Sequence, residues 1–194
     1  MTNYEAGVDP QIDDRATVGY AYTEDGRPTQ LGEGARIRSG TIIYQDVRIG
    51  DDFITGHRAL VREATEIGDS VIVGTDTVID GTTTIGSHVS LQTGVYVPTD
   101  TTIGDNVFLG PRAVLTNDPY PVRRDVDLVG PTIEDGVSVG ANATILPDVT
   151  IGHDSFVAAG AVITEDVPPE TLAVGTPADH QPLPDTLAAE NMLR

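Results

Sequence analysis

Residues 84–109 read TIGSHVSLQTGVYVPTDTTIGDNVFL, and from Ile85 onward every sixth residue of this stretch is aliphatic. The register extends from Leu31 to Leu115, with fourteen aliphatic residues at fifteen positions, and it resumes from Ile133 to Ile163. A period of six fits neither the 3.6 residues of a helical turn nor the two-residue alternation of a half-buried strand. It predicts an all-β chain of hexapeptide repeats, in which each aliphatic side chain points into a β-helix.

A second period, of eighteen residues, lies over the first. An Ile-Gly pair recurs at one strand of each triplet, beginning at Ile49, Ile67, Ile85, Ile103 and Ile151. Three hexads therefore complete one coil, and the coil is a triangular prism. Coils stack at the strand spacing of about 4.8 Å, so about seven of them form a short rod.

The residues expected at the corners agree with this fold. Gly, Asn and Asp tolerate the left-handed backbone conformation that a tight corner requires. Residues of this kind predominate three places after the aliphatic residue of the first strand, at Asp52, Ser70, His88, Asn106, Gly136 and Asp154. Three small residues precede the third strand and suit a narrow interior corner, namely Ala113, Ala143 and Ala161.

The register breaks once in the middle of the chain, over residues 116–132. The break contains three prolines and carries Arg123 and Arg124 side by side in an otherwise acidic protein. A long excursion from a compact domain is usually functional or disordered. We therefore expect either a flexible insertion or a protruding loop that closes over a substrate and touches a neighbouring subunit.

The two ends of the chain are less regular than the middle. Residues 18–31 are expected to form an irregular first coil with an excursion around residues 24–28. We assign residues 1–178 to the β-helix domain, including the 116–132 excursion, and residues 179–194 to a C-terminal tail. In this tail Asp185 can cap a short helix over residues 186–193.

The composition limits the classes of function. The 194 residues carry a net charge of −19 and include eleven Arg, no Lys and no Cys. Such an acidic surface repels nucleic acid and anionic membranes, and the absence of Cys excludes disulfides and thiolate chemistry. Acidic residues are spread along the whole chain, which favours solubility in concentrated salt over an interaction role. With no signal peptide pattern and no long apolar run, we expect a cytoplasmic, halophilic protein.

Residues 137–145 with 175–178, and residues 103–111, resemble the hexapeptide-repeat acyltransferases. Residues 87–98 and 115–118 resemble most closely the nucleotide-sugar N-acetyltransferases of that superfamily. The resemblance implies a left-handed winding, a homotrimer with active sites between subunits, and acetyl-CoA as co-substrate without a metal. It implies N-acetylation of an amino sugar carried on a nucleoside diphosphate. The alternative within the superfamily is an O-acetyltransferase acting on a sugar or another small acceptor.

Acyl transfer to an amine needs a neutral amine, a thioester carbonyl held close to it, and a donor for the developing oxyanion. His88 is the candidate catalytic acid–base residue, because a histidine side chain titrates near neutrality and a corner position can reach across a subunit cleft. Two other interpretations stay open. His88 can orient the substrate through a hydrogen bond, or it can be a tolerated turn residue.

Acceptor-binding candidates come from two regions. Asn117 and Asp118 open the excursion and can bind sugar hydroxyls or the amine, or cap the loop. Arg123 and Arg124 can hold a diphosphate, or pair with neighbouring carboxylates. The remaining candidates, in an otherwise plain coil, are His57 and Arg62, which can contact a nucleotide or sugar or serve structural hydrogen bonds.

Cofactor-binding candidates are small residues that leave the backbone open to a pantetheine arm. These are Gly140, Ala141, Ala159, Gly160 and, at the next corner, Thr164. Relatives often place a basic residue near Thr164, but Glu165 follows it here and no Arg occurs between Arg124 and Arg194. Backbone donors, solvent cations, or Arg112, Arg123 or Arg124 of a neighbouring subunit must then hold the cofactor's phosphates.

Two other classes of function share this fold. A γ-class carbonic anhydrase-like enzyme needs three histidines converging on zinc, and the four histidines here are far apart in sequence. A non-catalytic trimeric scaffold needs neither the long excursion nor the small-residue column. We therefore expect no metal and favour an acetyltransferase.

Overall fold

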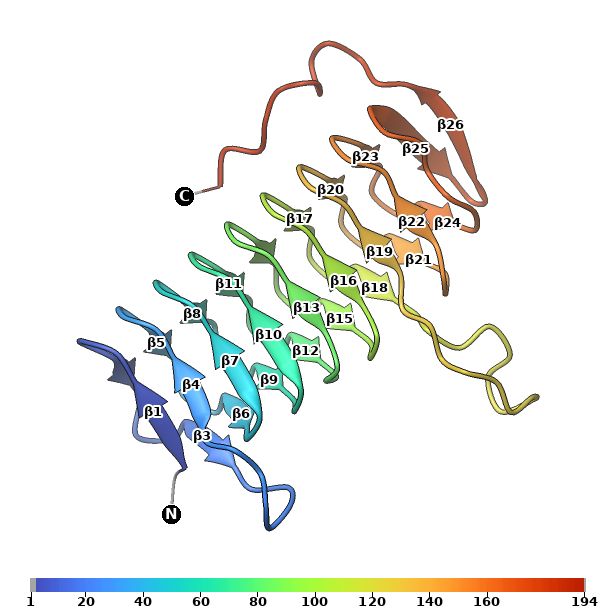
Figure 1. Ribbon diagram of the computed structural model, residues 1–194. Coiled ribbons are helices and arrows are strands. Elements are labelled where there is room, and N and C mark those ends of the chain that lie inside the picture. The colour runs from blue at the N-terminus through green and yellow to red at the C-terminus, as the bar shows by residue number, and fades with distance from the viewer. Residues whose placement is uncertain (1–2, 194) are drawn as a thin grey trace.

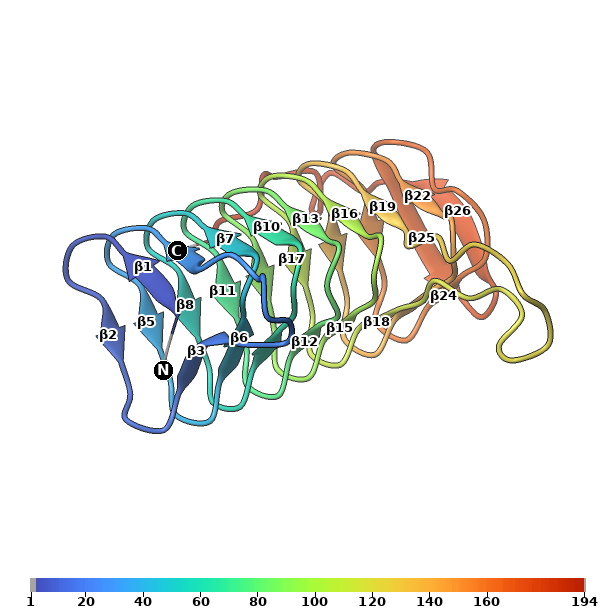
Figure 2. The same cartoon turned by 60° about the horizontal axis from the view of Figure 1, so that its bottom comes forward.

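The computed structural model describes residues 3–193 as a left-handed parallel β-helix with the shape of a triangular rod (Figures 1 and 2). Three parallel sheets form its faces. Sheet A contains β1 (Tyr4–Ala6), β4 (Thr29–Leu31), β7 (Val47–Ile49), β10 (Thr65–Ile67), β13 (Thr84–Ile85), β16 (Thr102–Ile103), β19 (Thr132–Ile133) and β22 (Thr150–Ile151). Sheet C contains β3 (Thr17–Tyr20), β6 (Ile42–Tyr44), β9 (Leu60–Val61), β12 (Val78–Ile79), β15 (Tyr96–Val97), β18 (Val114–Leu115), β21 (Thr144–Ile145) and β24 (Val162–Ile163).

Sheet B is the longest face, because a hairpin closes its end. Its parallel strands are β2 (Gln11–Ile12), β5 (Arg36–Ile37), β8 (Ile54–Thr55), β11 (Ile72–Val73), β14 (Ser90–Leu91), β17 (Phe108–Leu109), β20 (Ser138–Val139), β23 (Phe156–Val157) and β25 (Thr171–Gly175). The antiparallel strand β26 (Ala178–Pro182) pairs with β25 and covers the open end of the stack. Repeat proteins need such caps.

Each complete coil takes one strand from each sheet, so the described residues form eight complete coils, one more than the sequence pattern indicated. The first coil begins at Tyr4, before the expected start at Val18. The sequence period missed it because residues of this coil pair with partners twenty-five positions later, as Ile12 does with Ile37, and twenty-five is not a multiple of six. The chain then leaves the coil over residues 21–28, as expected, before β4 begins.

The long excursion leaves the stack without disturbing it. Paired residues in sheet A are normally eighteen apart, as Ile85 and Ile103 are, but Ile103 pairs with Ile133, thirty residues later. The insertion therefore adds twelve residues, which is two hexads, and the period of six survives it. We call residues 116–131 the arm, and Figures 1 and 2 show it projecting from the side of the rod.

The predicted interior and corners are confirmed. The aliphatic residues of the register are buried, and so is the one polar exception, Thr55, whose hydroxyl lies 3.2 Å from that of Thr41. His88, Asn106 and the other predicted non-glycine corner residues adopt positive φ, between 55° and 57°. The side chains of the three predicted small residues, Ala113, Ala143 and Ala161, are buried.

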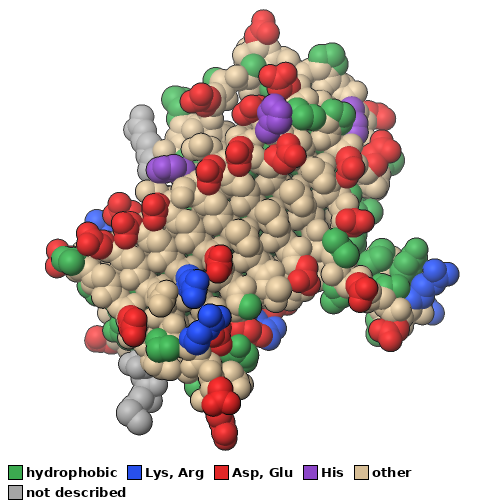
Figure 3. Space-filling model, viewed as in Figure 1, with side chains coloured by type: hydrophobic (Ala, Val, Ile, Leu, Met, Phe, Trp, Pro, Cys, Tyr) green, Lys and Arg blue, Asp and Glu red, His purple; other side chains and the backbone are tan. Residues whose placement is uncertain are grey.

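Carboxylates bind the backbone at the corner that joins sheets A and B. Asp51 accepts a hydrogen bond from the N–H of Glu33 at 2.7 Å, and Asp69 accepts one from the N–H of Asp51 at 2.8 Å. Asp105 and Asp135 repeat the contact further along the rod. Figure 3 shows the resulting row of acidic side chains. Some of the negative charge of this protein therefore satisfies the amides of the corner.

The expected helix over residues 186–193 is wrong. Residues 183–193 instead run back along sheet B without regular structure (Figure 1). An eight-residue helix is marginal by itself, since its nucleation is costly. The extended tail gains an anchor, because the Asn191 amide donates to the carbonyl oxygens of Asn106 and Gly136 at 2.8 and 3.1 Å and accepts from Ser138. The described residues also include no helix that could span a membrane.

The alternation of inward and outward side chains gives a first prediction. Ile103 points inward and is 1% exposed, whereas the adjacent Thr102 points outward on the same strand. Ile103→Ala should lower the free energy of unfolding by about 2–5 kcal/mol, through lost burial and the cavity it leaves. Thr102→Ala is the matched control and should stay within about 0.5 kcal/mol. Chemical denaturation measures both values, and equal losses would contradict the assigned register.

The acidic corner gives a second prediction. Carboxylates on successive coils, about 4.8 Å apart, repel each other by about 1 kcal/mol in water, and salt screens that repulsion. Asp69→Asn keeps an oxygen acceptor but removes the charge, so it should raise the melting temperature in low salt and weaken its rise with added salt. Asp185→Asn, on the tail, is the control. Melting curves from low to molar salt test this, and an unchanged salt response of the Asp69 variant would refute it.

Candidate functional site

The three edges of the prism differ in what they carry, and we name them by the sheets they join. Both excursions of the chain, residues 21–28 after β3 and the arm after β18, leave from the C–A edge (Figures 1 and 2). The A–B edge carries the carboxylate row. The B–C edge carries the column of small residues. Insertions are tolerated at an edge because they leave the stacked strands paired.

A hollow of about 650 Å³ lies at the base of the arm. Its volume is in the range of small-molecule sites. One wall comes from the arm and the other from the C–A corners of the last two coils. The lining residues are Tyr96, Thr116, Asn117, Asp118, Pro119, Pro121, Leu146, Pro147 and Thr164.

The two residues predicted at the start of the arm both line this hollow. Asn117 donates from Nδ2 to the hydroxyl oxygen of Thr99 at 2.9 Å, which fixes the arm to the coil below. Asp118 accepts a hydrogen bond from the N–H of Tyr120 at 2.8 Å and so shapes the first turn of the arm. Both side chains have structural partners, and both still face the hollow.

Tyr96 forms the end of the hollow nearest the middle of the rod. Its hydroxyl donates to Asp80 at 3.1 Å. Burial, with the charge of Asp80, raises the pKa of Tyr96, so the phenol keeps its proton at neutral pH. Sequence reasoning missed Tyr96, although an aromatic residue at an outward position of sheet C, as Tyr44 also is on β6, was a visible signal. Leu146 and Pro147 were missed because only the path of the arm makes them part of a site.

Arg62 and His57, predicted together, lie on opposite edges. Arg62 is on the C–A edge and donates to Asp80 at 2.8 Å and to Glu63 at 2.7 Å, which connects it through Asp80 to Tyr96. His57 is on the B–C edge, where its Nδ1 lies 3.3 Å from the carbonyl oxygen of Ser39. The structure therefore brings Arg62 toward the hollow and keeps His57 apart from it.

The outer part of the arm carries Arg123 and Arg124. The Arg124 guanidinium lies 4.7 Å from the centre of the Tyr120 ring, and neither arginine lines the hollow of its own chain. Val122 at the tip is fully exposed, and Leu128 is 44% exposed. Figure 3 shows these basic and apolar side chains extending away from the rod.

The predicted cofactor residues are divided between two edges. Gly140, Ala141, Ala159 and Gly160 stack on the B–C edge, where the N–H of Gly160 donates to the carbonyl oxygen of Ala141 at 2.9 Å. A Cβ on Gly140 would collide with the amide of Ala159, and one on Gly160 would meet open space. The small residues therefore leave this stretch of backbone uncovered. Thr164 lies across sheet C, in the hollow on the C–A edge.

His88 stands at the A–B edge, with φ of 57° and an exposed side chain. It lines a small depression of about 260 Å³ that also includes Ile72 and Leu193 of the tail. Within one chain, His88 and the arm hollow are on different edges of the prism. The structure does not bring the predicted catalytic residue to the predicted acceptor residues of the same chain.

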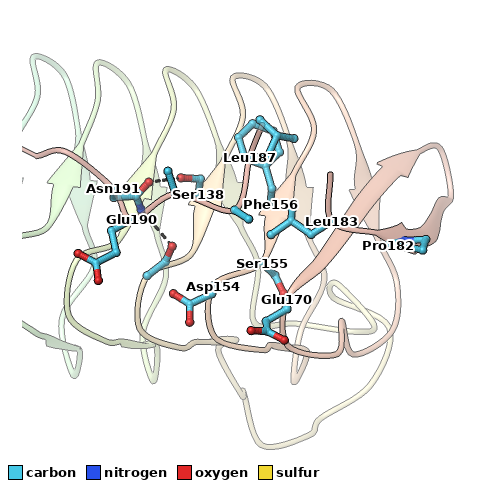
Figure 4. A pocket seen from close by; sticks show the side chains of 13 residues that line it. Ser138, Asp154, Ser155, Phe156, Glu170, Pro182, Leu183, Leu187, Glu190 and Asn191 are labelled. Carbon is cyan, nitrogen blue, oxygen red and sulfur yellow. Dashed lines mark hydrogen bonds between the residues drawn. The ribbon is translucent and has the colours of Figure 1, made fainter. Parts of the chain in front are cut away.

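A further hollow, of about 570 Å³, lies between the tail and sheet B (Figure 4). Phe156 and Leu187 supply apolar walls, while Asp154, Glu170 and Glu190 make the rim acidic. Sequence reasoning missed it, because it exists only where the tail is extended over the sheet. Ser138 is bonded to Asn191 there, so this hollow is also the place where the tail is anchored.

Comparisons with known proteins agree with the fold and show which residues match a known family of repeats. The model for "Bacterial transferase hexapeptide (six repeats)" matches residues 82–117 and 130–165. Perosamine N-acetyltransferase from Caulobacter crescentus, solved as a variant with CoA and GDP-perosamine, is 26% identical with a TM-score of 0.55. That match covers 73% of this chain and 56% of the enzyme, so the chain spans little more than half of its length.

Two further structures extend the comparison. A hexapeptide-repeat acetyltransferase from Vibrio cholerae, solved with acetyl coenzyme A, is 34% identical over 61% of this chain and 70% of that one, with a TM-score of 0.53. A maltose O-acetyltransferase from Clostridium difficile is 25% identical over 60% and 67% of the two chains, also with a TM-score of 0.53. A search of curated proteins gives no match. From its repeat, its fold and these matches, the chain belongs to the hexapeptide-repeat acyltransferase superfamily.

Proposed function

We propose that the chain is an acetyl-CoA-dependent acetyltransferase whose acceptor binds in the arm hollow. The observation that carries the proposal is the position of the hollow. It has the volume of a small-molecule site, and six of its nine lining residues fall within the stretches that match the family model. Solved relatives named as an N-acetyltransferase and an O-acetyltransferase match the fold of this chain.

The preferred acceptor is an amino sugar carried on a nucleoside diphosphate. A structural relative that binds a nucleotide-linked sugar supports this choice, and so do the two carbonyl- or carboxyl-bearing side chains at the base of the arm, Asn117 and Asp118. Such oxygens suit sugar hydroxyls and an amine. O-acetylation of a sugar is the second candidate, favoured by the maltose O-acetyltransferase match.

Acetyl-CoA would lie against the small-residue column of the B–C edge. Two solved relatives contain CoA or acetyl-CoA, and the exposed backbone at Ala159 and Gly160 leaves room for a pantetheine chain to approach it closely. Arg112 is on the same edge, one coil before Ala141. We assign Arg112 to the phosphates of the cofactor, where a guanidinium offers paired donors.

A homotrimer accounts for the polarity of the three faces. Sheet A presents Thr84, Thr102 and other polar residues to solvent, and the tail covers part of sheet B. Sheet C presents an apolar row, with Ile42 and Tyr96 at least 36% exposed. Apolar surface of this kind favours burial against another subunit. We propose that sheet C and the exposed apolar side chains of the arm meet neighbouring protomers, which would put active sites between subunits.

In such a trimer His88 would act on the hollow of a neighbour. The amine nitrogen attacks the thioester carbon, the carbon–sulfur bond breaks, and the acetyl group stays on nitrogen. His88 takes the proton that the amine loses and returns a proton to the CoA sulfur, so that CoA leaves as the thiol. The overall charge of −19 would keep the assembly soluble in concentrated salt, which is the environment we propose.

The zinc-enzyme alternative gains no support. Among residues 3–193, no three His, Cys, Asp or Glu side chains come together as metal ligands. His57 and His88 lie on different edges, and His180 is on β26 in the closing hairpin. The geometry of the chain therefore offers no reason to prefer a metal-dependent hydration reaction over acyl transfer.

The cofactor assignment gives a third prediction. Arg112→Ala should raise KM for acetyl-CoA about tenfold, because a phosphate loses a charged partner worth about 1.4 kcal/mol. KM for the acceptor should not change. Arg58→Ala is the matched control, since Arg58 is on the same edge but is paired with Asp76 at 2.8 Å. Thiol-release kinetics in molar salt measure these values, and equal effects of the two variants would disprove the role of Arg112.

The catalytic assignment gives a fourth prediction. His88→Ala should lower turnover at least about tenfold, or about 1.4 kcal/mol in the barrier, without dissociating the trimer. Unchanged turnover would remove His88 from the mechanism.

A mixing experiment separates a role across the subunit boundary from a role within the chain. Asn117→Ala should also be nearly inactive, since Asn117 lines the hollow and fixes the arm. Mixed trimers of the His88 and Asn117 variants, reassembled in equal amounts, should recover about a quarter of the wild-type sites if each site takes His88 from one protomer and Asn117 from another. No recovery over the separate variants would place both residues in one chain's site.

A further inference from the structure

A continuous row of side chains runs along the C–A edge from the first coil to the arm hollow, and no role above accounts for its aromatic end. We call it the edge strip: Tyr20, Tyr22, Tyr44, Arg62 and Asp80. Tyr20 and Tyr44 have ring centres 4.8 Å apart, and Tyr22 and Tyr44 have centres 6.1 Å apart. The strip thus begins with three neighbouring tyrosine rings in a protein that is only 5% aromatic.

The strip leads directly into the hollow. The Arg62 guanidinium lies 5.7 Å from the centre of the Tyr44 ring and donates to Asp80 at 2.8 Å. Asp80 in turn accepts the hydroxyl of Tyr96 at 3.1 Å, and Tyr96 lines the hollow. Tyr44 is three coils from Tyr96, a distance of about 14 Å at the strand spacing.

The first excursion holds the aromatic end of the strip in place. Asp46 accepts hydrogen bonds from the Tyr22 hydroxyl at 2.9 Å and from Nε of Arg27 at 2.8 Å. Tyr20 and Tyr22 remain 46% and 44% exposed. Rings that are fixed but open to solvent are preorganised for binding, because little side-chain entropy is lost when a ligand stacks on them.

The charges of the strip select the chemistry of the ligand. Arg62 is neutralised by Asp80 and Glu63, and Arg27 by Asp46. Paired arginines surrounded by carboxylates do not attract a phosphate. They do offer donors and acceptors at the rim of an aromatic surface, which suits an uncharged ring that stacks on tyrosine and hydrogen-bonds at its edge.

We propose that the edge strip binds an uncharged ring at the far end of the acceptor, at least about 14 Å from the group that is acetylated in the hollow. The base of a nucleotide sugar and the outer sugar of a glycan share this chemistry. The inference rests on the proposed function of the hollow, since it treats the strip as the remote part of the same acceptor site. Remote contacts of this kind raise kcat/KM by orienting the reacting end.

Acetylation kinetics with three acceptors test the strip and identify the source of the ring. The acceptors are a free amino sugar, the same sugar on a nucleoside diphosphate, and the same sugar in a disaccharide. Tyr20→Ala combined with Tyr22→Ala should lower kcat/KM at least about tenfold for the nucleotide-linked or the disaccharide acceptor and leave the free sugar unchanged. Val8→Ala, an exposed apolar site in the same coil, is the control and should change none of them.

The outcomes differ in what they reject. Equal losses for all three acceptors, or no loss for any, would overturn the strip as a subsite. Saturation-transfer NMR with a nucleoside and with an amine-free disaccharide gives a readout that needs no acetylation. In one outcome the wild-type protein acetylates none of the acceptors but transfers saturation to the ring protons of one probe, and the double variant transfers none. The proposed function then fails, and ring binding by the strip stands. If the wild-type protein and the double variant transfer saturation to a probe equally, or if neither does, the proposal that the strip binds a ring is overturned.

Discussion

The fold depends on one constraint, which is that each residue of a coil lies directly over a partner in the previous coil, eighteen positions earlier wherever no excursion intervenes. The parallel ladders make this register strict, since a slip of one residue would turn every aliphatic side chain outward. Insertions are therefore confined to the edges, and they must rejoin the stack in register. The arm does so by adding two whole hexads between Ile103 and Ile133. The candidate site residues lie mostly at the edges, because an insertion there leaves the ladders paired.

The same stacking explains how the chain uses its charge. An ion pair between coils joins residues eighteen apart, as in Arg58 with Asp76 and Arg62 with Asp80. Where no arginine is available, as at Asp51 and Asp69, the carboxylate accepts a backbone N–H from the neighbouring coil. Stacking thus places unlike charges together on the B–C and C–A edges, and like charges together on the A–B edge. The like charges repel, so the edge that satisfies its amides with carboxylates is the one most sensitive to salt.

The sequence predicts those features of the fold that follow from the six-residue period, and few others. The inward register, the positive-φ corners and the place of the arm are all consequences of counting by six, and all are confirmed. Residues 4–17 were missed because they join the stack before the period becomes regular at Leu31. The tail was assigned a helix from a capping residue and composition alone. Its real path depends on Asn191 meeting three carbonyl oxygens more than fifty residues away in sequence.

The candidate site was only partly predictable for a related reason. Counting by eighteen puts Arg62 and Asp80 on one edge and Ala141 and Ala159 on another, but it does not show that a hollow forms where the arm leaves. The two edges are separated by the width of sheet C. An acetyl group held on the B–C edge must therefore cross sheet C to reach the hollow of the same chain, or enter the hollow of a neighbour whose sheet C packs nearby. In the trimer proposed above, the second path would make the subunit boundary part of the reaction geometry.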